Sequence, residues 1–387
     1  MKAKINTIVL KIASRCNIDC SYCYEYHGED ASWKSKPKRF SPSNTLVLAS
    51  RITEHCTTHG LTHFGINLHG GEPALAGAKY IDTLLSTLSE NVSVPLRVGM
   101  QTNGTLVDQQ LLSVLKKHDV RVAVSLDGTE FANRRRVDHK GLPTWDRAVS
   151  GIAQLKDAGL LSGIQTVVDL FEEPSLILNS LSQYTPPEIE LGQPFANHDS
   201  IPGRRPPGVT LGDWLLKAFH AWVTTPALAS VKATILHDAL AAVLSNTTTT
   251  DWFPTRPPGY LVVATDGALE GLDTLKISGA QGRVLNMDIQ THSFDDALGH
   301  EQVVLRATQT LKRPTPCRGC AILEWCNGGY YPTRYSRENG FDNRSIYCKD
   351  WKILFSGIAL WVLKQPSISE QIKTEIRGKL DRLAEDM

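Results

Sequence analysis

The sequence predicts an α/β fold in which a partial (β/α)6 TIM barrel precedes a smaller, cysteine-rich module. Short β-branched runs alternate with helical patterns from residue 5 to about residue 192, which is typical of a parallel sheet built from β/α units. Four of the eight cysteines then gather between residues 317 and 348. The length of 387 residues suits one large domain and a smaller one.

Six runs are expected to form the barrel strands, at residues 6–13, 61–70, 95–104, 120–128, 161–169 and 187–194. Helices should begin at Ser41, with Pro42 in the first turn, and near Ala78, Asp108 and Thr144. Loops that follow barrel strands build the active site in this architecture. The motifs CNIDCSYC, HGGEP, TNGT and SLDG stand in those loops, so we expect them at one rim.

A Pro/Gly/Arg-rich stretch at residues 194–208 breaks the alternation, and two helical segments follow to about Ser245. Next, YLVVATDGALEGLDTLK predicts a hairpin that turns at Asp266 and Gly267.

Beyond the cysteine module, one helix is expected over residues 350–365, and a capping box of Ser367 and Glu370 should open a second. We place domains at residues 1–208 (barrel), 209–254 (helical bridge), 255–350 (cysteine module) and 351–387 (terminal helices).

Composition excludes several classes of protein. With 41 basic and 40 acidic side chains the net charge is +1, so no global field attracts nucleic acid or an anionic membrane. Lys11 interrupts the N-terminal apolar stretch, and no apolar run approaches about 18 residues, so we expect a cytoplasmic protein. Cysteines in a reducing compartment are metal ligands, nucleophiles or core residues rather than disulfides. Cys56 shares a helical stripe with Leu48 and Ile52 and is predicted to be core.

Cys16, Cys20 and Cys23 form a CxxxCxxC triad directly after the first strand. Three thiolates can hold three irons of a [4Fe-4S] cluster and leave the fourth iron open to a co-substrate. A zinc site is the alternative, in which His27 could supply a fourth ligand.

The HGGEP motif follows the second strand, and its residues suit a small zwitterionic ligand. Gly70 and Gly71 expose backbone groups, while the Glu72 carboxylate can accept hydrogen bonds from an ammonium group. Taken alone, such a motif could equally be an ordinary β-to-α turn.

The triad and the GGE motif together resemble radical S-adenosylmethionine (SAM) enzymes. The resemblance implies that the cluster binds SAM, that Tyr22 packs near its adenine, and that Glu72 holds its methionine ammonium. Ser125 of SLDG and Arg136 resemble the residues that hold the SAM carboxylate, although Arg134 or Arg135 could be the true counterpart. An external one-electron reductant of the flavodoxin or ferredoxin type is also implied.

The second group of cysteines comprises Cys317, Cys320, Cys326 and Cys348. Four thiolates can close every iron of a cluster, or hold a structural zinc. These residues resemble the SPASM/twitch extension of radical SAM enzymes, which implies a closed auxiliary [4Fe-4S] cluster. The family's further cysteines are replaced by Leu272 and Tyr330, so we predict one auxiliary cluster rather than two.

Within the hairpin, Asp273 falls where related SPASM enzymes carry an aspartate that takes a substrate proton. A carboxylate whose pKa is raised by burial can act as a general base. A structural role, capping the following turn, is the alternative for Asp273.

The segment at residues 317–348 resembles peptide maturases that form three-residue cyclophanes in ribosomally made precursor peptides. The resemblance implies that SAM is cleaved to a 5′-deoxyadenosyl radical, which takes a Cβ hydrogen so that this carbon joins an aromatic ring. Asp273 would take the ring proton and the auxiliary cluster the electron. Alternatives are an ether or thioether crosslink, epimerisation, or a non-catalytic iron-sulfur or zinc scaffold.

Overall fold

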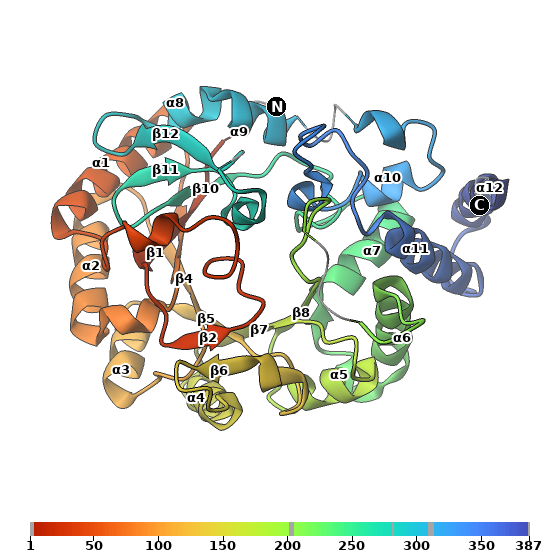
Figure 1. The fold of residues 1–387 in the computed structure, drawn as a ribbon, viewed down its shortest axis with the longest axis horizontal. Helices are drawn as coiled ribbons and strands as arrows, with labels where there is room; N and C mark the ends of the chain where they lie inside the picture. Colours follow the sequence, from red (N-terminus) through yellow and green to blue (C-terminus); the bar gives the residue numbers. More distant parts are fainter. Residues whose placement is uncertain (1–3, 201–204, 281, 309–312, 386–387) are drawn as a thin grey trace. The chain divides into compact units, whose positions relative to one another are not determined.

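The computed structural model describes residues 4–200, 205–280, 282–308 and 313–385, and it divides into two compact units (Figure 1). Unit 1 comprises Met1–Leu126, Asn133–Gln165 and Pro258–Arg306, and unit 2 comprises Asp127–Ala132, Thr166–Pro257 and Ala307–Met387. Each unit is assembled from segments far apart in the sequence. The predicted domains, with boundaries at residues 208, 254 and 350, are instead continuous in the sequence. That division stays a prediction.

Unit 1 is built on a sheet with the strand order β12-β11-β10-β1-β3-β4-β5-β7. Its parallel strands are β1 (Thr7–Ala13), β3 (Phe64–Gly70), β4 (Leu96–Thr102), β5 (Arg121–Ser125), β7 (Leu161–Val167) and β10 (Tyr260–Val263). Two antiparallel strands, β11 (Ala268–Glu270) and β12 (Val284–Asp288), extend it at one side. Strands β1, β3, β4, β5 and β7 lie at predicted barrel positions, whereas β10 was expected only as a hairpin strand; the predicted α/β class is confirmed.

The helices of unit 1 follow its strands in the chain, and Figure 1 shows α1 to α3 along the outer side of the sheet. They are α1 (Pro42–His59), α2 (Ala78–Asn91), α3 (Gln109–Lys117), α4 (Trp145–Asp157), α8 (Phe294–Gly299) and α9 (Glu301–Ala307). Helix α1 starts as predicted, because the Ser41 hydroxyl accepts a hydrogen bond from the Asn44 N–H and Pro42 takes the first position. Cys56 is buried on α1 beside Leu48 and Ile52, as predicted for a core residue.

Two short features complete unit 1. The predicted hairpin between β10 and β11 is confirmed, and its turn uses Gly267 at a φ of 92°. A two-stranded antiparallel ribbon of β2 (Ile18–Cys20) and β6 (Arg136–Asp138) pairs Cys20 with Arg136. Sequence periodicity does not reveal this ribbon, because three-residue strands are too short to show alternation.

Unit 2 contains one parallel strand pair, β8 (Glu188–Gly192) with β9 (Lys232–Ala233), and mostly helices. The helices are α5 (Pro174–Ser182), α6 (Leu211–Thr224), α7 (Thr234–Ser245), α10 (Leu323–Cys326), α11 (Cys348–Leu363) and α12 (Glu370–Glu385). Helix α6 approaches α11 closely at Gly212, whose N–H donates to an Asp350 carboxylate oxygen at 2.9 Å. Part of the predicted linker at residues 194–208, namely 201–204, lies outside the described residues.

The predicted capping box of α12 is wrong. The helix begins at Glu370, so the residue that caps it is Ser369, whose hydroxyl accepts a hydrogen bond from the Ile372 N–H. Ser367 stands two positions too early to reach the first turn. None of the helices in the described part of the chain combines the length and the apolar character needed to cross a membrane.

Candidate active site

The cysteine triad lies on one loop of unit 1, around the ribbon strand β2. Cys20 ends β2 and is buried, while Cys16 and Cys23 are half-buried. Burial raises the pKa of Cys16 to about 12 and that of Cys23 to about 11. As free thiols they would therefore stay protonated at neutral pH, and only a bound metal would supply the driving force to ionise them.

Sulfur spacing tests which metal group fits. Zinc–thiolate bonds of about 2.3 Å in a tetrahedron place sulfurs roughly 3.8 Å apart. Among the described residues, the single set of three donor atoms within 4.8 Å of one another is His55, His59 and Asp295, and it includes no cysteine. Neither cysteine group forms such a compact set in the described part of the chain, so the geometry gives no support to a zinc site at either group.

Glu72 follows β3 and is fully buried, at 0% exposure. Its carboxylate accepts hydrogen bonds from the Ala74 N–H at 3.0 Å, the Thr102 hydroxyl at 2.7 Å and the Asn103 N–H at 2.7 Å. Burial raises the pKa of Glu72 above its usual range, although these donors and Arg136 oppose the shift. A buried carboxylate of this kind gains stability from a cationic partner, so it fits an ammonium group.

Gly70 and Gly71 allow β3 to approach the first strand and the cysteine loop. Gly70 has a φ of 134°, and a Cβ there would lie 1.9 Å from the Ala13 carbonyl oxygen. A Cβ on Gly71 would lie 2.5 Å from backbone atoms of Arg15. Any side chain at either position would clash with this backbone, so the close approach of β3 depends on both glycines.

The predicted SAM-carboxylate residues also belong to unit 1. Ser125 ends β5, and its hydroxyl accepts a hydrogen bond from the Gln101 amide at 2.8 Å. Arg136 opens β6, is 7% exposed, and donates to the Tyr22 hydroxyl at 2.8 Å. The Arg135 guanidinium lies over the Tyr22 ring, 4.6 Å from its centroid.

These contacts help to decide which arginine lies near the cysteine triad and Glu72. Arg136 is opposite Cys20 in the ribbon and acts electrostatically on Glu72. Arg135 instead stacks over the ring of the same tyrosine. The geometry therefore favours Arg136 over Arg135 as the cation nearest to the triad and Glu72.

Asp273 opens a 3-10 turn after the hairpin and is 7% exposed. Its carboxylate forms an ion pair with Lys11 of β1 and accepts a hydrogen bond from the Tyr24 hydroxyl at 2.6 Å. Burial acts to raise the pKa of Asp273, but the Lys11 ammonium, with His69 and Lys276, outweighs it and holds the pKa below its usual range. The expectation of a raised pKa is therefore wrong, because the cation that faces Asp273 is 262 positions away in the sequence.

Sequence reasoning missed several polar residues of this region. Lys11 also pairs with Glu25 at 2.9 Å, and Glu25 pairs with Lys276, so the cysteine loop, β1 and the hairpin share one buried ion-pair network. The sequence feature that could have revealed this network is Lys11, a charged residue inside an otherwise apolar strand. Asn103 of the TNGT motif was missed as well, although it bonds Glu72 and its amide lies 3.8 Å from Cys16 Sγ.

The second cysteine group lies in unit 2, where Cys317, Cys320, Cys326 and Cys348 line one pocket together with Trp351. The Trp351 indole N–H is buried and has no hydrogen-bond partner in the described part of the chain. A sulfur-rich group is an acceptor for such a donor. The donor set and this orphaned N–H both fit a closed cluster in the pocket.

The two positions where further cysteines are missing are both filled by buried side chains. Leu272 is buried in unit 1 immediately before Asp273. In unit 2, Tyr330 is buried and packs on Trp252, with ring centroids 4.7 Å apart. Neither position offers a metal ligand.

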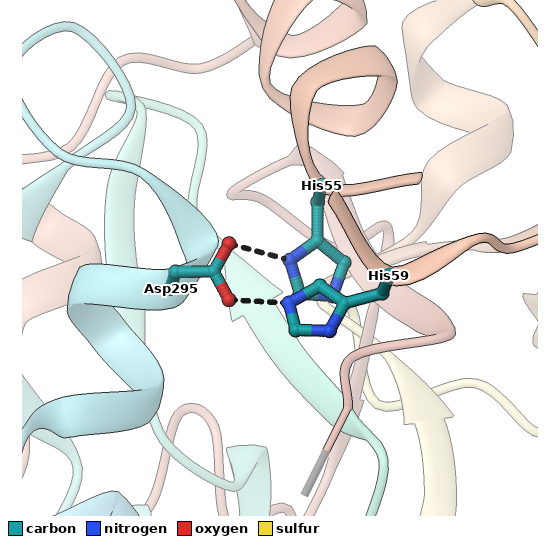
Figure 2. Close-up of side chains that lie close together, drawn as sticks. All are labelled: His55, His59 and Asp295. Atoms are coloured by element: carbon teal, nitrogen blue, oxygen red, sulfur yellow. Dashed lines mark hydrogen bonds and ion pairs between the residues drawn. The ribbon is translucent and has the colours of Figure 1, made fainter. Parts of the chain in front are cut away.

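Three side chains that could in principle hold a metal ion, His55, His59 and Asp295, join helix α1 to helix α8 (Figure 2). His55 Nδ1 lies 3.2 Å from one oxygen of Asp295, and His59 Nε2 lies 2.6 Å from the other. However, the Ile5 N–H donates to His55 Nε2 at 3.2 Å, so the neutral ring carries its proton on Nδ1. A metal would need that same nitrogen unprotonated, and we therefore interpret the group as a hydrogen-bonded link between helices.

This link predicts a pH-dependent loss of stability. Burial holds the pKa of His55 below its usual value of about 6.5, although Asp295 opposes the shift. His55 therefore takes up a proton more readily in the unfolded chain than in the folded chain. As a result, the free energy of unfolding falls as the pH drops below about 6.5. We expect His55→Gln to flatten this dependence between about pH 7.5 and 5.5 in denaturant unfolding. The exposed His220, changed to Gln, is the control; equal slopes for wild type and His55→Gln would contradict the assignment.

Comparison with known proteins shows which chains and structures this protein is similar to. Residues 10–174 match the Radical SAM superfamily. The cysteine-type anaerobic sulfatase-maturating enzyme of Clostridium perfringens is 24% identical over 388 residues, which cover 91% of this chain and 95% of that enzyme. An uncharacterized protein of Methanocaldococcus jannaschii is 28% identical over 162 residues, and the match spans 42% of this chain and 52% of that protein.

Two solved structures share the fold. The C. perfringens enzyme anSMEcpe with bound AdoMet matches with a TM-score of 0.79 and 19% identity, over 92% of this chain and 98% of that one. Streptococcus suis SuiB bound to its precursor peptide SuiA matches with a TM-score of 0.62 and 15% identity, over 90% of this chain and 76% of that one. The match to the Radical SAM superfamily at residues 10–174 includes the cysteine triad and Glu72, and the two solved structures show the same fold over most of the chain.

Proposed function

We propose that this protein is a radical SAM maturase that joins a Cβ carbon to an aromatic ring in a ribosomally made precursor peptide, forming a cyclophane. The observation that carries the proposal is the pairing of two cysteine groups in one chain: a triad beside a buried glutamate, and a quartet around one pocket. Two solved structures of similar fold support the class of substrate. The enzyme anSMEcpe was solved with bound AdoMet, and SuiB was solved with its precursor peptide.

In this proposal the residues of unit 1 bind and orient the co-substrate. Cys16, Cys20 and Cys23 would hold an open [4Fe-4S] cluster, which with SAM supplies one-electron hydrogen abstraction when bound. Glu72 would bind the methionine ammonium, and Ser125 with Arg136 its carboxylate. Tyr22, fixed between Arg135 and Arg136, would offer its ring to the adenine.

The remaining residues would complete the crosslink. Once the new bond forms, the ring must lose one proton and one electron to regain its aromaticity. Asp273 is ionised beside Lys11 and can take the proton at a carboxylate oxygen. The cluster held by Cys317, Cys320, Cys326 and Cys348 would take the electron that the ring loses. A different electron, supplied to the triad by an outside flavodoxin- or ferredoxin-type protein, would start the reaction. A cytoplasmic setting fits such a reductant.

A second candidate follows from the 24% identity with the sulfatase-maturating enzyme, which extends over 91% of the chain. In this alternative the same residues would oxidise a cysteine or serine side chain of a protein substrate to an aldehyde. Ether or thioether crosslinking and epimerisation are further outcomes of the same initial hydrogen abstraction.

Coexpression with a short peptide encoded beside the gene tests these outcomes. We expect mass spectrometry to show the loss of two hydrogen atoms per crosslink, with no backbone fragments between the joined residues. An aldehyde would react with a hydrazide probe and fragment normally, and epimerisation would leave the mass unchanged. The Cys16→Ala variant serves as the inactive control, and an aldehyde product would replace the cyclophane proposal with the second candidate.

A further inference from the structure

Beside the cysteine pocket of unit 2 lies a buried arginine that no sequence motif singles out. Arg334 is 1% exposed and ends the 3-10 turn Tyr331–Arg334. Its Nε donates to the Gly328 carbonyl at 2.9 Å, and its Nη2 donates to the carbonyls of Asn327 at 2.9 Å and Gly329 at 2.8 Å. Three consecutive carbonyls therefore converge on one guanidinium.

The loop that makes these contacts is shaped for them. Asn327, Gly328 and Gly329 all adopt left-handed backbone angles, with φ values of 53°, 83° and 71°. A Cβ on Gly328 would lie 2.7 Å from Arg334 Nη2, so a glycine is required there for the guanidinium to fit. The loop begins directly after Cys326, and the Gly328 N–H points back to that cysteine.

Carbonyl groups accept hydrogen bonds from Nε and Nη2 of Arg334 but do not neutralise its charge. No carboxylate within the described residues forms an ion pair with it, and Asp342 acts on it only at longer range. Burial lowers the pKa of Arg334, and the groups that oppose this shift and favour its charged form are chiefly Cys326 and Cys317. Because arginine stays protonated, and a buried charge without a counter-charge is costly, the geometry requires an anionic partner on the cysteine side.

We propose that Arg334 is a fixed counter-charge for the auxiliary cluster, raising its reduction potential so that it accepts an electron. This inference rests on the proposed function in assigning the cluster its role as electron acceptor. Reduction adds one negative charge to a cluster whose four thiolates already make it anionic, and a cation held nearby stabilises the reduced form more than the oxidised form. Arg334 acts through the cluster, as a positioning and tuning residue that does not touch the substrate.

The test isolates the quartet from the rest of the chemistry. The full-length protein with Cys16, Cys20 and Cys23 all changed to Ala keeps only the second cysteine group, and it is reconstituted with iron and sulfide under anaerobic conditions. Its midpoint potential is measured by a redox titration followed by EPR. Arg334→Gln removes the charge and retains N–H donors for the loop, whereas Arg334→Lys retains the charge.

We expect Arg334→Gln to make reduction at least tenfold less favourable, a shift of about 59 mV to more negative potential. Arg334→Lys should stay close to the parent protein. The matched control is Arg318→Gln, which removes an exposed cation next to Cys317 and should have little effect because solvent screens it. If Arg334→Gln does not take up iron, Arg313→Gln replaces it, since Arg313 also acts on Cys326, and a smaller shift in the same direction is expected.

Three results would overturn the inference: a potential that Arg334→Gln leaves unchanged, equal shifts in the Gln and Lys variants, or a quartet that binds zinc and no iron. The measurement needs no peptide. A protein whose cluster responds as expected but modifies no peptide would retain the role of Arg334 and lose the proposed function.

Discussion

Replacing Cys16 with alanine should abolish the reductive cleavage of SAM and leave the auxiliary cluster in place. An open cluster needs all three thiolates of the triad, and the Asn103 amide, 3.8 Å from Cys16 Sγ, is a hydrogen-bond donor to sulfur rather than a substitute ligand. Iron analysis of the reconstituted variant should show the loss of one cluster. Chromatographic assay for 5′-deoxyadenosine should find none.

Cys56→Ala is the matched control for this experiment. Cys56 is a buried cysteine on α1, outside both cysteine groups, so its removal should leave iron content and SAM cleavage at the level of the wild type. Cleavage of SAM by the Cys16 variant at the rate of the wild type would remove the triad from the proposed chemistry.

Changing Asp273 to asparagine should spare SAM cleavage and stop product formation. A positioned general base contributes roughly 10²- to 10⁴-fold, so crosslinked peptide should fall by about that factor while 5′-deoxyadenosine still accumulates. Asparagine keeps the shape of the side chain, and Lys11 keeps Glu25 as its counter-charge, so the variant should fold. Lys11 holds the pKa of Asp273 below its usual value of about 3.9. Protonation of Asp273 should therefore not lower the rate of product formation near neutral pH.

Asp266→Asn is the control on the same hairpin. Asp266 is partly exposed at the turn and pairs with Lys36, so its change should leave both SAM cleavage and product intact. Normal crosslinking by Asp273→Asn would show that Asp273 only stabilises the buried ion-pair network. Loss of SAM cleavage in that variant would point instead to a disturbed cysteine loop.

Local patterns predicted much of the fold. Strand and helix positions follow from β-branched runs and from caps such as Ser41, which depend on neighbours a few residues away. Cysteine spacing is equally local, which is why both cysteine groups stand out in the sequence. The cap of α12 was misplaced from Ser369 to Ser367 because serines two positions apart offer the same local signal.

Contacts between distant segments could not be predicted in the same way. The expected pKa of Asp273 had the wrong direction because Lys11, which faces it, comes from the first strand. Glu72 is held by the Asn103 N–H from a different β/α unit. For Arg334, an arginine among glycines and aromatic residues carries no signature of the three carbonyls that surround it.

Unit 1 is assembled from segments that are far apart in the sequence, and this determines when it can fold during synthesis. The strand beside β1 on one side is β10, so Thr7 pairs with Tyr260, and the hairpin that contributes Asp273 and Lys276 to the network around Glu25 follows it. A ribosome must therefore release more than two thirds of the chain before unit 1 can close. Iron insertion at the triad should consequently wait until β10 and the hairpin after it have been made, and a fragment that ends at residue 257 should fail to fold as an independent domain.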